Sequence, residues 1–250
     1  MTLPSDPVAA TRRPTPSIGR AHWVAELGLR LRIHFPLKLA GTGAFTWLFF
    51  VAYFHLLRHP NGPVTLMPLT PLDAWVPFQP SMLWAYLSLW VYVGVAPGLQ
   101  RTFRELVVYG LWVGGLCLAG LGLFWLWPSA VPPFVADVSG HAAFAALQGV
   151  DAAGNACPSM HVAVAIFTAI RVERLLLETA APLALRVLNL LWFGSIAWST
   201  LAVKQHVAID VAAGALLGGG FALASQRWRP RPSAQKRAHI IDRLPTDAAP

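Results

Sequence analysis

The sequence predicts an all-α membrane protein, a six-span transmembrane helical bundle that is preceded by an N-terminal interfacial helix. Of the 250 residues, 56% are hydrophobic and 12% are charged, and the mean hydropathy of +0.53 is typical of membrane proteins rather than soluble domains. Long apolar runs alternate with short polar loops. The 19 Lys and Arg residues gather at the chain ends and in some of these loops, so the net charge of +8 does not indicate nucleic acid binding.

The chain divides into three parts. They are a cytoplasmic tail with an amphipathic helix (1–35), a six-span membrane domain (36–226) and a basic cytoplasmic tail (227–250). In the first part, Trp23, Val24, Leu27 and Leu31 recur at helical spacing, which indicates an interfacial helix; a plain cytoplasmic segment is the alternative.

The expected spans are about 39–57, 82–99, 106–127 and 158–170, then one that ends near 203 and one that begins at 206. The fourth is short, and a re-entrant segment is the alternative there. The turn before the sixth span follows from length. Residues 187–224 hold only three ionisable groups, Lys204, His206 and Asp210. As one helix they would reach about 57 Å, against a bilayer core of about 30 Å, so the run must turn at its polar middle.

The topology follows from the positive charges. Six spans put both termini on one side of the membrane, and 17 of the 19 Lys and Arg residues then lie on that side. The positive-inside rule therefore predicts that both termini are cytoplasmic, in what we expect to be a bacterial inner (cell) membrane. The connection 128–157 and the turn around His206 are then both expected on the outer face.

Two polar clusters meet on that face. Pro158 is a helix-start signal, and it places Ser159 and His161 in a first turn, where free N–H groups favour an anion. In the other cluster His206 and Asp210 share a helix face at i and i+4, so the carboxylate can orient the imidazole. A lone histidine in a membrane protein is more often a packing residue. Two at facing helix starts, one of them backed by a carboxylate, indicate a functional site.

These residues resemble a known family. Pro158-Ser159-Met160-His161, followed by Ser199-Thr200, His206 and Asp210, resembles the second and third motifs of the PAP2 family, the type 2 phosphatidic acid phosphatases. The stretch 155–163 is similar to the branch that includes inositol phosphorylceramide synthases. Residues 73–80 also resemble a stretch of that branch, and their Pro-Phe-Gln-Pro is expected to shape a turn.

The resemblance implies a role for each motif residue. His206 corresponds to the nucleophile, Asp210 to the group that orients and activates it, and His161 to the general acid. The implied substrate-binding residues are Lys204, Ser159, Ser199, Thr200 and Asn155. No cofactor and no metal are expected.

The sequence departs from the family pattern in its cations. The third motif usually has Arg where Thr200 stands, and the first motif, a Lys six residues ahead of Arg-Pro, is missing. Arg101 and Arg104 do not replace it because the charge count puts them in the cytoplasm. Lys204 is the best substitute phosphate clamp, and a snorkelling interfacial lysine is the alternative interpretation.

Three functions remain open. The first is a lipid-phosphate phosphatase that works at the outer membrane face through a phosphohistidine. The second uses the same residues as a lipid phosphotransferase that moves a phospho-headgroup to an alcohol acceptor. The third is a non-enzymatic transporter, which ranks last because no repeat is visible. The expected partners are a lipid phosphate substrate and membrane lipids, with no nucleic acid, and a homo-oligomer is left open.

Overall fold

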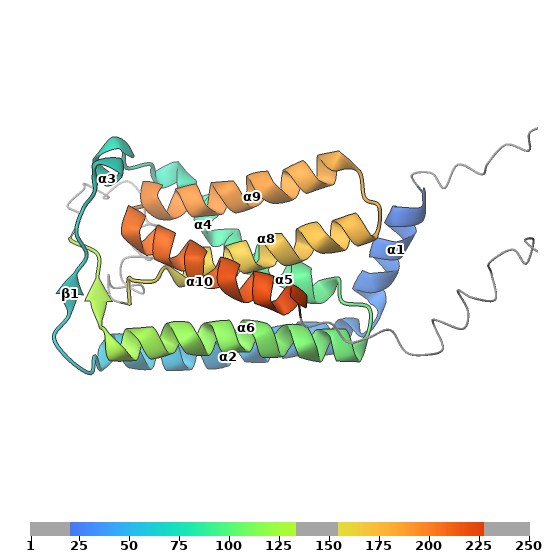
Figure 1. Ribbon diagram of the computed structural model, residues 1–250, viewed down its shortest axis with the longest axis horizontal. Helices are drawn as coiled ribbons and strands as arrows, with labels where there is room; N and C mark the ends of the chain where they lie inside the picture. The colour runs from blue at the N-terminus through green and yellow to red at the C-terminus, as the bar shows by residue number, and fades with distance from the viewer. Residues whose placement is uncertain (1–20, 134–154, 228–250) are drawn as a thin grey trace, which may run out of the picture.

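The computed structural model describes residues 21–133 and 155–227, and helices make up most of both ranges. The elements are α1 (Ala21–Arg32), α2 (Phe35–Arg58), β1 (Thr65–Leu66), α3 (Pro71–Trp75), the 3-10 helix η1 (Pro80–Met82), α4 (Leu83–Leu87), α5 (Leu89–Gly98), α6 (Phe103–Leu126), β2 (Ser129–Ala130), α8 (Met160–Glu178), α9 (Leu183–Ala202) and α10 (Ala208–Arg227). The long helices run side by side along one axis (Figure 1). The predicted mainly helical bundle is confirmed.

Four of the described helices are long and apolar enough to cross a membrane. Helices α2 and α6 have 24 residues each, and α9 and α10 have 20 each. At about 1.5 Å per residue they reach roughly 36 and 30 Å, which matches a bilayer core. These helices suggest a membrane protein, whereas the predicted total of six spans stays a prediction.

The region predicted as the second span is divided into two helices. Helix α4 ends before Ser88, whose Oγ donates a hydrogen bond to Ala85 O at 2.7 Å, and α5 then begins at Leu89. Pro97 lies inside the last turn of α5 and the helix ends one residue later. The hydrophobic run was visible in the sequence, but this local side-chain bond was not.

The predicted fourth span corresponds to α8, which lies in the middle of the bundle and packs against α5, α6, α9 and α10 (Figure 1). Its polar C-terminal half is paired inside the protein. Glu173 accepts a hydrogen bond from Arg186 of α9 at 2.6 Å, and Arg174 donates to Gln226 of α10 at 3.2 Å. These contacts with neighbouring helices accompany an α8 that continues to Glu178, beyond the predicted end of the span at residue 170.

Two glycines bring α10 close to α8. A Cβ on Gly214 would lie 2.3 Å from Ser159 O, and one on Gly218 would lie 2.0 Å from Ala163 O. No side chain fits at such distances, so the Gly-x-x-x-Gly pattern lets the two backbones touch. At the same junction Ser159 N donates a hydrogen bond to Asp210 O at 2.9 Å. The starts of α8 and α10 are therefore fixed against each other.

Helix α1 is attached to the end of the bundle that lies far from the strands (Figure 1). Lys38 Nζ donates to Arg30 O at 2.6 Å and to Gly98 O at 2.8 Å, so it joins the last turns of α1 and α5. Cations at helix C-termini are favourable because they satisfy carbonyls and oppose the dipole. The amphipathic helix predicted from the sequence is present, and its interfacial position stays a prediction.

The opposite end holds a feature that the all-α prediction missed. Strands β1 and β2 pair in parallel, with Thr65 opposite Ser129 and Leu66 opposite Ala130. The pairing arises because the loops that leave α2 and α6 run together there, and Trp127 Nε1 donates to Thr65 Oγ1 at 3.1 Å. Close to the strands, buried apolar side chains form a small cluster, Met67, Val131, Ala156, Cys157 and Val207.

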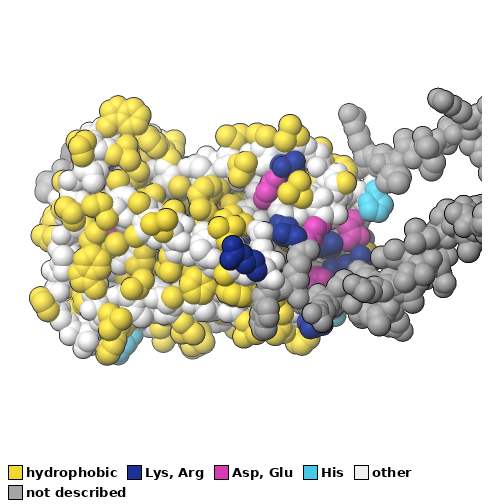
Figure 2. All heavy atoms as spheres, viewed as in Figure 1, with side chains coloured by type: hydrophobic (Ala, Val, Ile, Leu, Met, Phe, Trp, Pro, Cys, Tyr) yellow, Lys and Arg dark blue, Asp and Glu magenta, His cyan; other side chains and the backbone are white. Residues whose placement is uncertain are grey.

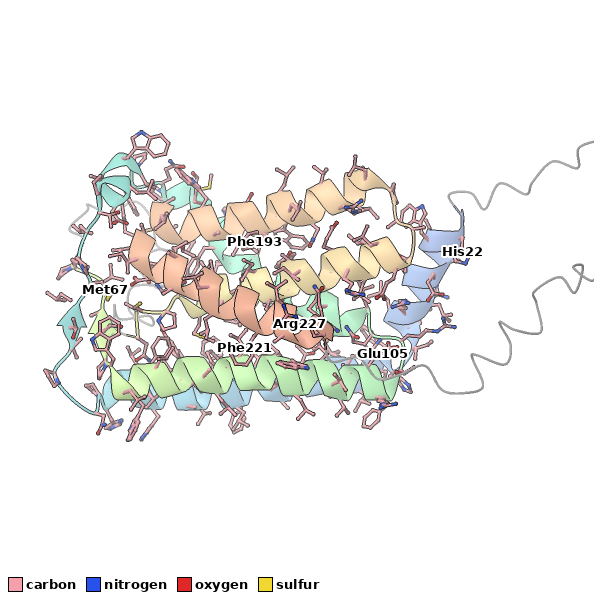
Figure 3. The ribbon with its side chains drawn as sticks, viewed as in Figure 1. His22, Met67, Glu105, Phe193, Phe221 and Arg227 are labelled. Carbon is pink, nitrogen blue, oxygen red and sulfur yellow. The ribbon has the colours of Figure 1, made fainter. Side chains whose placement is uncertain are left out.

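The two ends of the molecule differ in the charged side chains that they expose (Figure 2). Figure 2 shows hydrophobic side chains over most of the visible face, while Lys, Arg, Asp and Glu gather at the end where α1 lies. In Figure 3, Met67 marks the strand end and His22 and Glu105 mark the charged end. The same view shows Phe221 between α10 and α6, where it contacts Trp112 edge-to-face.

Candidate active site

His206 lies in the short turn between α9 and α10. The turn is closed by Thr200 O, which accepts hydrogen bonds from the amides of Gln205 and His206 at 3.1 Å each. Lys204 adopts a left-handed backbone with φ of 57°, and α10 begins at Ala208. The predicted reversal of the chain at its polar middle is present, and it places His206 at the strand end of the bundle.

Asp210 stands one helical turn from His206, as the i and i+4 spacing predicts. Its Oδ2 lies 3.6 Å from His206 Nδ1 and accepts a hydrogen bond from Val207 N at 3.0 Å. Asp210 is fully buried. Within the described residues neither His206 Nδ1 nor Asp210 Oδ1 has a hydrogen-bond partner. At 3.6 Å, His206 Nδ1 and Asp210 Oδ2 lie just beyond hydrogen-bond distance.

His161 enters the same space from the first turn of α8. Its ring stacks on Tyr86, with centroids 4.1 Å apart and planes 19° apart, and Trp90 meets it edge-to-face at 5.7 Å. Tyr86 Oη lies 3.4 Å from His161 Nδ1, so the other ring nitrogen, Nε2, is available for chemistry. The centroids of the His161 and His206 rings are 6.3 Å apart. The structure therefore brings both predicted histidines together.

The start of α8 is held by Ser159. Its Oγ accepts a hydrogen bond from Val162 N at 3.4 Å, which is the usual N-cap contact. Ser159 is fully buried. The side chain predicted to bind phosphate thus caps the helix that presents His161.

The hydroxyls of Ser199 and Thr200 point into their own helix. Ser199 Oγ donates to Ile196 O at 2.6 Å and Thr200 Oγ1 donates to Ala197 O at 2.8 Å. Both residues are fully buried. Their contact with the site is made by the backbone, because Thr200 O accepts the hydrogen bonds that close the turn carrying His206.

Lys204 lies two residues before His206, and its ammonium contacts backbone carbonyls in and directly after α3. Nζ donates hydrogen bonds to Asp73 O at 3.1 Å and to Val76 O. Asn155 shares a cavity with the two imidazoles. Its Nδ2 donates to Tyr53 O of α2 at 3.0 Å.

That cavity has a volume of about 660 Å³ and is mainly apolar. It is bounded by α2, α4, α5, α6 and α8. One face of α2 lines it from Tyr53 near the histidines to Lys38 at the other end, a distance of about 22 Å along the helix. Leu37, Trp90 and Leu111 line it and are also exposed on the surface, so the cavity opens on the side of the bundle.

Cys157 lies next to the site without the properties of a nucleophile. Burial, together with the nearby Asp210 carboxylate, raises the pKa of its thiol to about 11. The thiol is therefore protonated at neutral pH, and thiols react as thiolates. In the described ranges, no group of three or more His, Cys, Asp or Glu side chains is arranged to hold a metal ion.

Two residues of this region were not found from the sequence. Tyr86 orients His161, and in the sequence it looked like any aromatic residue of an apolar run. Asp73 accepts a hydrogen bond from Ala208 N at the start of α10. The Thr70-Pro71-Leu72-Asp73 pattern could have indicated a helix start, but not that the carboxylate contacts a second helix.

The fold and the site together define a class: a helical membrane-type protein with two facing histidines and a buried carboxylate at one end of the bundle. The sequence model of the PAP2 superfamily matches residues 72–224, which is more than half of the chain. The chain therefore belongs to the PAP2 superfamily, whose members are generally phosphatases or phosphotransferases. A comparison with curated proteins found no match, and neither did a comparison with solved structures.

Proposed function

We propose that this protein is an integral-membrane lipid-phosphate phosphatase that works through a phosphohistidine on His206. One observation carries the proposal. His206 and His161 line one end of a mainly apolar cavity, with the Asp210 carboxylate 3.6 Å from His206 Nδ1. An apolar cavity next to two imidazoles suits a phosphate ester that carries a long hydrocarbon chain.

The chemistry begins with His206. Because Nδ1 faces Asp210, Nε2 is the nitrogen that attacks phosphorus. The N–P bond forms while the P–O bond to the lipid breaks, and His161 gives its proton to the departing oxygen. Water then attacks phosphorus and passes a proton to His161. The N–P bond breaks, its electron pair returns to His206, and phosphate leaves.

The phosphate-binding roles stay proposals. The proposed role of Asn155 is supported by its position in the lining of the cavity. Ser159, Ser199 and Thr200 support theirs less directly, because their hydroxyls are engaged with backbone groups of helices that present the histidines. The contact proposed between Lys204 and phosphate requires its ammonium to turn from the carbonyls that it contacts.

We also propose that both termini are cytoplasmic and that the site faces outward across a bacterial inner membrane. The charged end of the molecule in Figure 2 is the end where α1 lies, whereas the turn between α9 and α10 that carries His206 lies at the opposite, strand end in Figure 1, which supports this orientation. Ala142→Cys tests it, in the segment 134–154, which is outside the described residues. An impermeant thiol reagent should label this cysteine from the outer side. Labelling only from the cytoplasmic side would contradict the orientation.

Phosphate release by the purified protein in lipid nanodiscs tests the function. We expect release from lipid phosphates, little release from glycerol phosphate, and full activity in EDTA, since no step uses a metal. Loss of activity in EDTA with recovery on adding Mg²⁺ or Zn²⁺ would contradict the mechanism. Parallel reactions with a lipid alcohol acceptor distinguish hydrolysis from headgroup transfer, the alternative function. A protein that neither releases nor transfers phosphate from any lipid would point to the transporter.

A further inference from the structure

The Asp73 carboxylate joins two segments that are far apart in the sequence. Its Oδ2 accepts hydrogen bonds from the amide and the hydroxyl of Thr70, both at 2.7 Å, at the start of α3. Its Oδ1 accepts one from Ala208 N at 2.8 Å. Ala208 is the first residue of α10 and lies midway between His206 and Asp210. Asp73 therefore supplies an acceptor, and a negative charge, to the N-terminus of the helix that carries Asp210.

Lys204 joins the same two segments through its own side chain, which reaches from the turn before α10 to the α3 segment. Its ammonium donates to Asp73 O and to Val76 O, and Val76 is the residue that caps the C-terminal end of α3. A third bond, from Gln79 N to Ala202 O at 2.9 Å, ties the following loop to the end of α9. The left-handed backbone of Lys204 is unfavourable for a non-glycine residue and persists only where the surroundings hold it.

The turn is thus held on both sides of His206, at Lys204 two residues before it and at Ala208 two residues after it. We propose that Asp73 is a positioning residue for His206 and that, with Lys204, it sets the geometry of His206 against Asp210. Asp73 touches neither imidazole in this arrangement and acts through the α10 backbone. The inference rests on the proposed role of His206 as nucleophile.

The consequence for catalysis is a rate effect. His206 Nδ1 and Asp210 Oδ2 are 3.6 Å apart, so a small displacement of the α10 start changes whether they can bond. Substrate binding depends mainly on the cavity, which Asp73 does not line. A 1 Å misplacement of catalytic groups can cost about 100-fold in rate. Loss of Asp73 should therefore lower kcat by roughly 10- to 100-fold and leave KM nearly unchanged.

The experiment compares Asp73→Ala, Asp73→Asn and Thr70→Val in the full-length protein. Asp73→Asn keeps one amide oxygen that can accept from Ala208 N, so it should recover much of the rate that Asp73→Ala loses. Thr70→Val is the matched control. It removes a bond of similar length from the same carboxylate but leaves the contact with α10, so its kcat should stay within about twofold of the wild type.

Hydrogen exchange provides a readout that does not depend on activity. Asp73→Ala should accelerate exchange of the amides in 207–211, and Thr70→Val should not. Wild-type kcat and exchange in Asp73→Ala would overturn the inference, and so would an equal loss of kcat in Thr70→Val. If Asp73→Ala does not fold, Asp73→Leu, which keeps a branched side chain at this position and also removes the acceptor for Ala208 N, is compared with Thr70→Val by the same two measurements. If the wild type releases no phosphate, the proposed function fails, and exchange at the α10 start still tests whether Asp73 holds it.

Discussion

The two histidines have different surroundings, and these surroundings favour different tasks. His206 has a buried carboxylate beside Nδ1, which favours one tautomer and would stabilise the positive charge that develops in the proposed attack of the ring on phosphorus. His161 is held by the rings of Tyr86 and Trp90 and has no carboxylate among its described contacts. A ring held in place by aromatic contacts and open at Nε2 suits proton transfer to a leaving oxygen.

The first prediction separates the two roles. His206→Ala should abolish turnover and any acid-labile phosphate on the protein. His161→Ala should slow hydrolysis of a lipid phosphate by about 10²- to 10⁴-fold, the usual contribution of a general acid. With p-nitrophenyl phosphate, whose leaving group needs little protonation, the first step should be partly restored. The measurement is the amount of labelled phosphate that is trapped on each variant by rapid quenching during turnover.

Asp210→Asn is the companion variant, because the amide can hold the wrong imidazole tautomer. It should fold normally and react much more slowly than the wild type. Label that appears in His206→Ala and disappears in His161→Ala would mean that the histidines exchange roles. If no label is trapped even on rapid quenching while hydrolysis runs at full rate, direct attack by water becomes the better account.

At the scale of elements, the junction of α8 and α10 fixes the distance between the histidines. His161 belongs to α8 and His206 precedes α10, and the two helices touch through Gly214 and Gly218. Where two backbones are in contact, no flexible side chain lies between them that could move to accommodate an added methyl group. The alignment of the site therefore depends on residues well away from the reacting atoms.

The second prediction tests this junction. Gly218→Ala should lower the melting temperature and the phosphatase rate, because the new methyl group would lie 2.0 Å from Ala163 O. Gly220→Ala is the control on the same helix, since nothing lies within 4 Å of its Cβ position. Alanine is the better helix former by about 1 kcal/mol, so the control should be neutral or slightly stabilising. Equal effects of the two variants would contradict the role of the junction.

The sequence predicted these elements unevenly, for physical reasons. Long apolar runs predicted α2, α6, α9 and α10 because a bilayer demands length and hydrophobicity alone. The break at Ser88 and the extension of α8 to Glu178 depend on single hydrogen bonds and on partners from other helices, which hydropathy does not encode. Motif spacing predicted that His161, His206 and Asp210 lie near one another, and these side chains are neighbours in the structure, whereas their catalytic roles stay predictions. Asp73 was missed because its contact with Ala208 spans 135 residues.

At the scale of the whole molecule, the cavity joins the end of the bundle that holds the two histidines to its interior. It reaches from the two histidines past Gly110 of α6 toward Lys38. Gly120 of the same helix lies against Met160, next to His161. Ten residues of helix separate Gly120 from Gly110, which is about 15 Å. A phosphate held between the imidazoles would therefore place the far part of a long acyl chain beside Gly110.

The last prediction follows from that depth. Gly110→Leu should fill the far part of the cavity, which Gly110 lines, and its Cβ has room because nothing lies within 4 Å of that position. Hydrolysis of dioleoyl phosphatidic acid should fall. Hydrolysis of dioctanoyl phosphatidic acid, whose acyl chains are shorter, should change little. Gly122→Leu is the control on α6, with equally open surroundings and no part in the cavity lining. The measurement is kcat/KM for the dioleoyl lipid divided by kcat/KM for the dioctanoyl lipid. This ratio should drop several-fold in Gly110→Leu alone, because each lost methylene contact is worth about 0.8 kcal/mol. An unchanged ratio would mean that the chains lie along the outer surface of the bundle, and the cavity would then hold only the headgroup end of the substrate.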